Sequence, residues 1–383
     1  IRFREVSHTA PYRLLGCVRG AFGTKAQAHA SGTAAYRLID PPYKVLFPDW
    51  TLQRDIAANI VDFINETGAN QMDFDGHEGT YATGMGDLAF NAFAEQVFRD
   101  SDHPVVFGSS RANHYFWHFN HYLNWGEPWY AGFRESQADV RFANQPFLEN
   151  NYYPNMLGWF LITEHTTTED IDWMLGRAAG YNAGYALVVR ENALANPNME
   201  TIVKQINLWT AAQRAGLFSA EQRTWLKNPG NDVHLYHEAE KWFLQRFQKL
   251  VFEHEAQVLQ PGQPTSSSWT FDNPRQVRHA QYVLLASGKS GEIRNPVIEL
   301  DNSLSLEIPI ALAAGESLVL DGSETAKLYN SKGKFIRTVP LQQSLPELTV
   351  GSHSLLFDAE MDATDDVKAV LSVKVLESTE QVK

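Results

Sequence analysis

The sequence changes its pattern once, at Pro229-Gly230, and this change most constrains the fold. Before it, predicted strands and helices alternate with a period of about 35 residues, which is typical of βα units on a parallel sheet. After it come short runs rich in β-branched residues and separated by Gly, Asn, Asp or Pro, the pattern of an antiparallel sandwich. The chain of 383 residues is long enough for two domains. We therefore expect a βα domain over residues 1–228 and a β-sandwich over residues 229–383.

Hydrophobic periodicity and capping residues locate the elements of the first part. Apolar residues recur at helical spacing, so one face of their helix should pack inward; they are Ile56, Ile60, Phe63 and Ile64. Ser219 and Gln222 form the pattern of a capping box, which marks the start of a helix. Helices are expected over 52–66, 88–99, 168–180, 199–215 and 219–226, and strands over 69–74, 105–108, 156–162 and 185–189.

This alternation predicts a (β/α)8-type (TIM) barrel, in which parallel strands close into a ring inside a layer of helices. If residues 185–189 are the eighth strand, residues 69–74 are the fourth, and the sixth lies within residues 112–153. Residues 14–18 would be the third strand, which leaves no room for the first two. We therefore predict that these two strands are supplied by an upstream segment or by a second chain.

The stretch Asn70–Gly79 reads NQMDFDGHEG and is the most acidic of the predicted strand ends. Because side chains alternate along a strand, Asp73 and Asp75 should share one face, and Phe74 should point into the packing between strand and helix. Gly76 allows a sharp turn directly after Asp75. Two carboxylates on one face repel each other, which favours a catalytic role over a solvated acidic turn or a calcium loop. Barrels present catalytic groups at such strand ends.

The segment 112–153 is rich in aromatic, basic and acidic side chains and has little periodicity. We interpret it as a long excursion at the active-site face. Its candidate residues are His114, Trp117, His118, His121, Trp125, Glu127, Trp129, Arg134, Glu135, Arg141 and Glu149.

Three histidines of this segment, His114, His118 and His121, step by four and three residues and would line one face of a helix. Zinc ligation is one interpretation of such spacing. A hydrogen-bonding wall around a sugar, or plain packing, is the commoner use of histidine, so we expect neither a metal nor another cofactor. Arg111 with His114 could instead bind an anionic sugar.

Composition narrows the class of partner. The formal charge of −13 argues against nucleic acid or an anionic membrane surface, and no apolar run approaches the roughly 20 residues that span a bilayer. Cys17 is the only cysteine, which excludes an internal disulfide. Ten Trp and 14 Tyr suit a carbohydrate partner, because the C–H faces of sugar rings stack on aromatic rings.

The segment Met72-Asp73-Phe74-Asp75-Gly76, within a barrel followed by an antiparallel β domain, resembles the TIM-barrel retaining glycoside hydrolases of the α-galactosidase-like superfamily. The resemblance covers the architecture and this one segment. It implies an aspartate nucleophile at the tip of the fourth strand and a second carboxylate, the acid/base, after the sixth.

Roles can then be assigned to individual residues. Asp75 is the nucleophile candidate and Asp73 its substitute; retention needs the two carboxyl groups about 5 Å apart, and inversion roughly 6.5–9.5 Å. Apolar surroundings raise a carboxyl pKa, as an acid catalyst requires, which favours a glutamate flanked by tryptophans. The acid/base candidates are therefore, in order, Glu127, Glu135 and Glu164. The expected substrate-binding residues are Glu78, His77, Arg111, His114, His118, Trp125, Trp129 and Arg134.

Loops that follow parallel strands gather at one face of a barrel. We therefore expect Trp125, Trp129 and His118 to lie at the mouth of the same pocket as Asp75.

The sequence thus predicts a glycoside hydrolase that acts on a poly- or oligosaccharide outside the cytoplasm, in the periplasm or the extracellular space. Two alternatives stay open. A polysaccharide lyase would use His or Tyr as the base that removes the proton beside a uronate carboxylate. A non-catalytic carbohydrate-binding protein would hold sugar through Trp125 and Trp129 without turnover.

Overall fold

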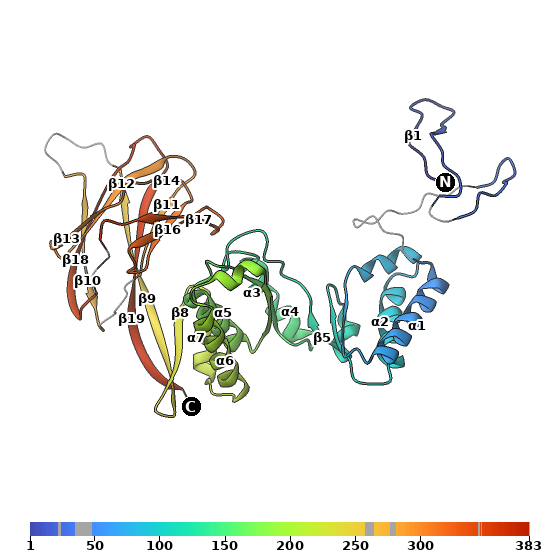
Figure 1. Cartoon of the computed structure of the whole chain (residues 1–383), viewed down its shortest axis with the longest axis horizontal. Coiled ribbons are helices and arrows are strands. Elements are labelled where there is room, and N and C mark those ends of the chain that lie inside the picture. Colours follow the sequence, from blue (N-terminus) through green and yellow to red (C-terminus); the bar gives the residue numbers. More distant parts are fainter. Residues whose placement is uncertain are drawn as a thin grey trace.

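The computed structural model describes residues 1–21, 24–34, 48–256, 264–275, 281–343, 345 and 347–382. The protein is a mixed α/β structure in which helices and short parallel strands precede a large antiparallel β region. The parts follow one another along the longest axis, from the amino-terminal residues to the antiparallel strands (Figure 1). No helix in the described ranges is both long enough and apolar enough to cross a membrane.

Parallel strands occur in two small sheets. The first sheet has the order β3 (Gln71–Phe74), β4 (Val106–Ser109), β5 (Asn120–Leu123), and the second pairs β6 (Met156–Ile162) with β7 (Gly184–Val189). All the strands predicted between residues 69 and 189 are present, and β5 lies inside the segment 112–153. The described residues do not close into a ring of eight strands, because the two sheets are separate and β3 has an unpaired edge. The predicted closed TIM barrel is therefore not observed.

The helices begin and end close to the predicted positions. Asp49 caps α1 by accepting from the Leu52 N–H at 2.9 Å, and the capping box predicted at Ser219 and Gln222 is confirmed. The box of α5 starts at Thr167, one residue before the expected helix start. The helices are α1 (Trp50–Thr67), η1 (His77–Thr83), α2 (Asp87–Asp100), η2 (His114–His118), α3 (Ala138–Ala143), α4 (Gln145–Asn150), α5 (Thr168–Tyr181), η3 (Glu191–Ala195), α6 (Met199–Arg214) and α7 (Ala220–Leu226).

The connection from β4 to β5 is a short 3₁₀ helix, η2, instead of an α-helix. Phe116 of η2 is fully buried, and its ring lies 4.9 Å from that of Phe90 in α2, so η2 covers the sheet as a crossover helix would. Only Phe119 separates its last residue, His118, from β5. His118 therefore lies at the amino end of the sheet, opposite the end where Asp75 follows β3.

The amino-terminal residues form a separate hairpin. β1 (Glu5–Val6) pairs antiparallel with β2 (Leu14–Leu15), away from the parallel sheets (Figure 1). Leu14 and Leu15 are 46% and 38% exposed. The prediction of a third barrel strand at residues 14–18 is wrong, because these residues pair within their own hairpin and bury no core face.

The antiparallel region consists of two sheets around one hydrophobic core. One sheet has the order β17-β16-β15-β11-β19-β9-β8, and the other has the order β10-β18-β12-β13, with β14 also paired to β12. Buried residues from both sheets, including Leu284, Ile298, Phe357 and Leu371, belong to the same core. The strands are β8 (Asp232–Glu238), β9 (Lys241–Glu255), β10 (Ser267–Asn273), β11 (Gln281–Ser287), β12 (Glu292–Leu300), β13 (Leu304–Glu307), β14 (Ala311–Ala313), β15 (Ser317–Leu320), β16 (Thr325–Tyr329), β17 (Phe335–Pro340), β18 (Gly351–Glu360) and β19 (Lys368–Val382).

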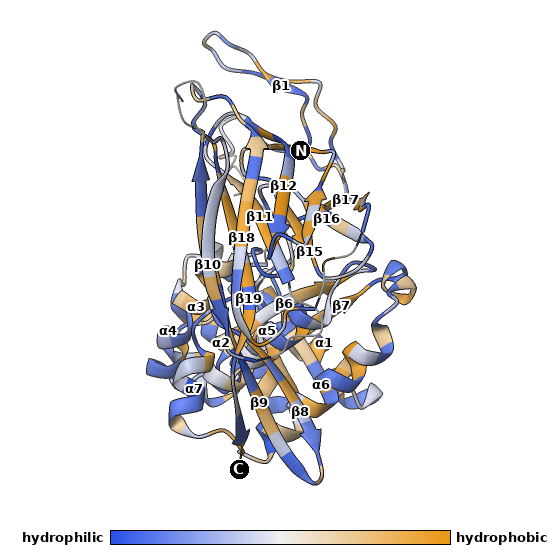
Figure 2. Ribbon diagram, turned by 90° about the vertical axis from the view of Figure 1, so that its left-hand side faces the viewer, coloured by the Kyte–Doolittle hydropathy of each residue, from blue (hydrophilic) through white to orange (hydrophobic). Residues whose placement is uncertain are grey.

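A ribbon made of β8, β9 and the end of β19 joins the sandwich to the helices. The ribbon extends past the sandwich and lies beside α5 and α6 (Figures 1 and 2). Val233, Leu235, Leu244 and Val382 from this ribbon share a core with those two helices. Neither β8 nor β9 was predicted from the sequence, although Val233 and Leu235 of β8 alternate with polar residues as in a half-buried strand.

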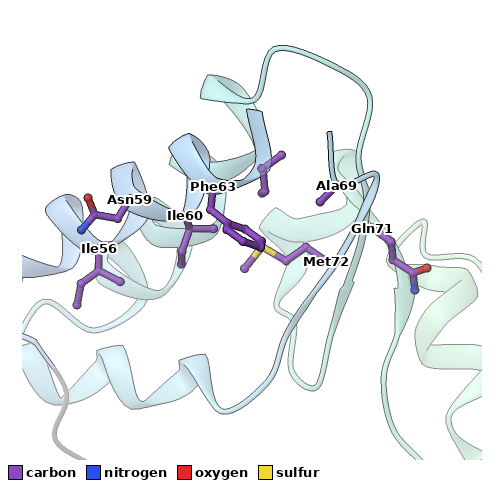
Figure 3. A pocket seen from close by; sticks show the side chains of 8 residues that line it. Ile56, Asn59, Ile60, Phe63, Ala69, Gln71 and Met72 are labelled. Carbon is purple, nitrogen blue, oxygen red and sulfur yellow. The ribbon is translucent and has the colours of Figure 1, made fainter. Parts of the chain in front are cut away.

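The free edge of β3 borders an apolar groove. The Asn70 carbonyl accepts a hydrogen bond from the N–H of Val106 in β4, and the Phe74 carbonyl accepts one from the N–H of Ser110, which follows β4. The backbone N–H and C=O groups of Gln71 and Asp73 therefore point away from the sheet. The groove has a volume of about 320 Å³ and lies between α1 and β3 (Figure 3). Its lining residues are Ile56, Asn59, Ile60, Phe63, Ile64, Ala69, Gln71 and Met72.

A histidine links the ribbon to the helices and should make stability depend on pH. His234 of β8 donates through Nδ1 to Asp172 of α5 at 2.7 Å. Burial lowers the pKa of His234, but the hydrogen bond and charge of Asp172 raise it more, so its pKa lies above the ordinary 6.5. A group whose pKa is higher in the folded state stabilises the fold when the pH is below its pKa in the unfolded state. This stabilisation is lost as the pH rises through its pKa in the folded state.

We therefore expect the difference in unfolding free energy between wild type and His234→Gln to be larger at about pH 6 than at about pH 9. Chemical denaturation at both values measures it. A difference that does not change with pH would contradict the prediction.

Candidate active site

The carboxyl end of β3 presents two carboxylates to solvent. Asp73 and Asp75 are exposed, whereas Phe74 between them is 2% exposed, so the predicted alternation is confirmed. The Phe74 ring packs 5.5 Å from the ring of Phe107 and 6.1 Å from that of Phe93, on the helix side of the sheet. The opposite face of β3 is therefore the polar, open one.

Tyr122 of β5 fixes Asp73 across the sheet. Its hydroxyl donates to Asp73 Oδ2 at 2.8 Å and accepts from Gln71 Nε2 at 2.8 Å. Burial, and then the hydrogen bond to Asp73, raise the pKa of Tyr122 to about 12. Gly108 of β4 lies between the two side chains: a Cβ there would sit 2.0 Å from Asp73 Oδ1 and 2.5 Å from Tyr122 Cζ. Three neighbouring strands thus build one compact acidic site.

Asp75 stands at the turn that follows β3. Gly76 adopts a φ of 69°, and its N–H donates to Ser110 Oγ at 3.3 Å, while the Ser110 N–H donates to the Phe74 carbonyl at 3.0 Å. The end of β4 therefore holds this turn in place. Within the described ranges the Asp75 carboxylate has neither a hydrogen-bond nor an ion-pair partner, so it is free to meet a ligand.

His77 lies behind the sheet instead of in the site. It is 6% exposed, and its ring stacks 4.4 Å from that of Phe90. Its Nδ1 donates to the Phe74 carbonyl at 3.1 Å, and burial lowers its pKa to about 4. The structure packs His77 on the helix side of the sheet, away from the open face of β3 where a substrate-binding role was expected. Glu78 is half-buried beside it.

The loop after β5 runs directly onto β6. A Cβ added to Gly158 of β6 would lie 2.6 Å from the Trp125 carbonyl oxygen and 3.1 Å from Gly126 Cα. This close approach places Trp125 and Glu127 beyond the carboxyl end of β5. Trp125 is half-buried, whereas Glu127 is exposed, and its carboxylate has no hydrogen-bond or ion-pair partner among the residues that the structure describes.

Arg141 organises this loop from beneath. It is fully buried, and its guanidinium lies 4.0 Å over the ring of Phe160. Burial lowers its pKa to about 10, an effect that the charge of Glu127 opposes. The guanidinium donates to the backbone carbonyls of Gly126, Ser136, Leu157 and Trp159. One cation therefore ties the Glu127 loop to β6.

Trp129 and Glu164 lie together beyond the ends of β6 and β7. The Arg190 guanidinium sits 4.6 Å over the ring of Trp129. Glu164 accepts from the amide of Asn192, and its Oε1 lies 3.7 Å from His165 Nε2. Arg190 and Asn192 both follow β7. Trp129 and Glu164 therefore contact residues that follow β7, whereas Asp73 and Asp75 belong to β3 and the turn after it.

Arg134 and Glu135 belong to the junction with the sandwich. Arg134 donates to Asp170 at 2.8 Å and to Asp232 at 2.7 Å, so its charge is neutralised and it is not free for substrate. The structure therefore places Arg134, expected to bind substrate, in ion pairs at the junction with the sandwich. Glu135 packs against the hairpin between β16 and β17, where a Cβ at Gly333 would lie 2.3 Å from its Oε2. Desolvation there raises the pKa of Glu135.

The three histidines of the excursion do not share a helix face. His114 and His118 lie in η2, and His121 lies in β5, where its Nδ1 accepts from the Phe107 N–H at 3.1 Å. Across the described ranges, no group of three or more His, Cys, Asp or Glu side chains is arranged to hold a metal ion.

His118 packs edge-on against Tyr115 and Phe98, with ring centroids 4.9 and 6.3 Å apart. The prediction that His118 shares a pocket with Asp75 is wrong, because η2 carries it to the amino end of the sheet. Arg111 and His114 remain exposed after β4, at the Asp75 end.

The sequence pattern does not reveal the roles of Tyr122, Gly108 and Arg141. A glycine inside a strand signals close approach of another group, so Gly108 carried a usable signal. Tyr122 carried none, because β5 has only four residues and its register was not predictable. Arg141 stands among many polar residues of the excursion, and burial of a lone arginine cannot be read from composition.

Gly108→Ala should damage the site while leaving the fold intact. The added Cβ would overlap both Asp73 Oδ1 and the Tyr122 ring, so the two side chains must separate. A displacement of about 1 Å costs roughly a hundredfold in kcat/KM. The control is Gly184→Ala on β7, where the nearest atom would be Met156 Sδ at 3.4 Å. Equal kcat/KM for the two variants on any glycan that the protein cleaves would contradict this prediction.

Comparisons with known proteins do not assign this chain to a family. No protein-family model matches the sequence, and no curated protein matches it. Among solved structures, an isomalto-dextranase of Arthrobacter globiformis T6, complexed with panose, is 7% identical; the match covers 84% of this chain and 72% of that chain, with a TM-score of 0.33. An exo-β-1,3-galactanase of Phanerochaete chrysosporium is 12% identical over 39% of this chain and 44% of that chain, with a TM-score of 0.15. Neither TM-score reaches the level of a shared fold.

Proposed function

We propose that this protein is a glycoside hydrolase that acts on a poly- or oligosaccharide. The observation that carries the proposal is the open face of β3, where Asp73 and Asp75 are exposed at the carboxyl end of a parallel strand. Glycoside hydrolysis uses a pair of carboxylic acids. In this proposal β3 to β7 are consecutive strands of a barrel-type sheet, which presents its catalytic groups at such strand ends.

The two aspartates take different roles in this proposal. Asp75 is the nucleophile, because its carboxylate is unpartnered within the described ranges. Asp73 already accepts a hydrogen bond from Tyr122, which lowers its nucleophilicity and suits it to hold substrate or to orient the site. Tyr122 and Gly108 would then act as positioning residues for Asp73.

Glu127 is the proposed acid/base. It follows β5, it is exposed, and it lies on a loop that Arg141 anchors. The other two candidates are less available, because Glu164 is bonded to Asn192 and Glu135 packs on the sandwich hairpin. Trp125 and Trp129 on the same loop would stack on sugar rings.

One observation weighs against a lyase that uses Tyr122 as its base. A lyase of this kind needs a deprotonated base next to the substrate. Tyr122 is the tyrosine at the carboxylate pair, and its pKa of about 12 keeps it protonated at neutral pH. Tyr122 is therefore suited to donate a hydrogen bond, which is a binding role in a hydrolase.

The test is an assay of the whole chain against α- and β-linked oligosaccharides and polysaccharides, both neutral and uronate-containing. A hydrolase releases new reducing ends, and NMR of the first product gives its anomeric configuration. Product that absorbs in the ultraviolet would replace this proposal by the lyase. Sugar binding that needs Trp125 or Trp129, with no turnover on any substrate, would replace it by the binding protein.

A further inference from the structure

Two arginines among the described residues are fully buried, and they differ in how their N–H groups are used. Arg141 donates from all three of its nitrogens to backbone carbonyls. Arg177, on α5, donates only through Nη1, to the Asn231 carbonyl at 2.8 Å. Its Nε and Nη2 are buried and have no partner among the described residues. Buried guanidinium N–H groups without acceptors are costly, so this pair requires an explanation.

The two unpartnered nitrogens lie on the same edge of the guanidinium. The N–H bonds of Nε and Nη2 run nearly parallel, and this edge is the one that grips a single anion with two hydrogen bonds. Trp173 covers the group on one side, with its ring centroid 5.7 Å from Arg177 Cζ. Trp173 Nε1 itself donates to the Pro229 carbonyl at 2.8 Å, so it offers Arg177 no acceptor.

The carboxylates of this region are already paired with other cations. Asp232 forms ion pairs with Arg134 and Lys249, and Arg134 also pairs with Asp170. Arg177 forms no ion pair with any described carboxylate. Burial, and then the charge of Arg134, lower the pKa of Arg177 to about 9, although the charge of Asp232 opposes both. An uncompensated buried cation is among the most costly groups in a protein.

We propose that Arg177 holds a small inorganic anion of the halide type, bound by Nε–H and Nη2–H. Full burial of the side chain limits the ligand to a small one, and chloride is the anion that we propose. The anion neutralises the cation and satisfies both N–H groups at once. The same guanidinium has a structural role, because its Nη1 donates to Asn231 in the segment that connects α7 to β8.

The first test is thermal unfolding of the whole chain in sodium chloride and in sodium gluconate at equal ionic strength. Gluconate is too large to enter the site. A ligand that binds only the folded state raises Tm, here by roughly 2–4 °C at saturating chloride. Arg177→Met should lose this chloride-specific shift. Lys227→Met, which removes a nearby cation lying 5.1 Å from the Tyr181 ring, should keep it. An equal shift in wild type and Arg177→Met would overturn the proposal.

The second test uses wild-type protein only, so it holds even if Arg177→Met does not fold. Crystals soaked in sodium bromide should show anomalous density within hydrogen-bond distance of both Arg177 Nε and Nη2. Electron density that refines as water there, with no anomalous signal, would refute the anion.

Discussion

Asp75→Asn should abolish turnover of whichever glycan the protein cleaves, and it should leave the thermal transition nearly unchanged. Removing a nucleophile from an enzyme costs at least about a thousandfold in kcat. The fold should tolerate the change, because the Asp75 carboxylate is exposed and supports no described hydrogen bond or ion pair. Steady-state kinetics and a melting curve of the same preparation measure both effects.

Asp73→Asn is the matched control for this experiment. It removes the other carboxylate of the same strand, and an amide in its place can still accept from the Tyr122 hydroxyl. We expect Asp73→Asn to lose less of kcat than Asp75→Asn. Activity of Asp75→Asn within tenfold of wild type would exclude Asp75 from the mechanism, and the reverse ranking would give the nucleophilic role to Asp73.

Arg141→Met should strongly destabilise the fold. The change leaves the carbonyls of Gly126, Ser136, Leu157 and Trp159 buried without their donors. Each orphaned buried group costs about 1–3 kcal/mol, so we expect a loss of roughly 4 kcal/mol or more in unfolding free energy. Urea denaturation measures this loss.

Arg99→Met serves as the control for Arg141→Met. Arg99 pairs with Glu95 and Asp100 at the surface, and its side chain is 61% exposed. Such surface pairs contribute at most about 1 kcal/mol. Similar losses for the two variants would show that the buried carbonyls find other donors and that Arg141 does not anchor the Glu127 loop.

Periodicity and capping predicted most of the regular structure. Helical spacing of Ile56 and Ile60 located α1, and the Ser219–Gln222 box located α7, because both patterns are local in the sequence. The predicted inward face of α1 was only partly right: Ile64 is buried, but Phe63 is 63% exposed. The alternation around Phe74 correctly predicted which face of β3 is open. The strand β8 was missed although its buried Val233 and Leu235 alternate with polar residues. In β9 the signal is weaker, because Trp242, Phe243 and Leu244 follow one another without alternation.

The candidate site was predictable only where one strand determines it. Asp73 and Asp75 share a face because of backbone geometry, which any β-strand imposes. His118 was misplaced because a 3₁₀ helix of five residues takes the place of a full crossover helix. Arg134 was misassigned because its partner Asp232 lies 98 residues away. Contacts of this kind depend on tertiary packing and leave no local pattern.

The position of β3 at the edge of its sheet has a consequence for heat inactivation. Among the described residues, hydrogen bonds hold this strand on one side only, and the backbone amides of Gln71 and Asp73 face away from β4. An edge strand of four residues can detach without unfolding the sandwich core, since local opening costs less free energy than global unfolding. Activity should therefore fall at a lower temperature than the main unfolding transition, and the amides of β3 should exchange with solvent faster than those of β4.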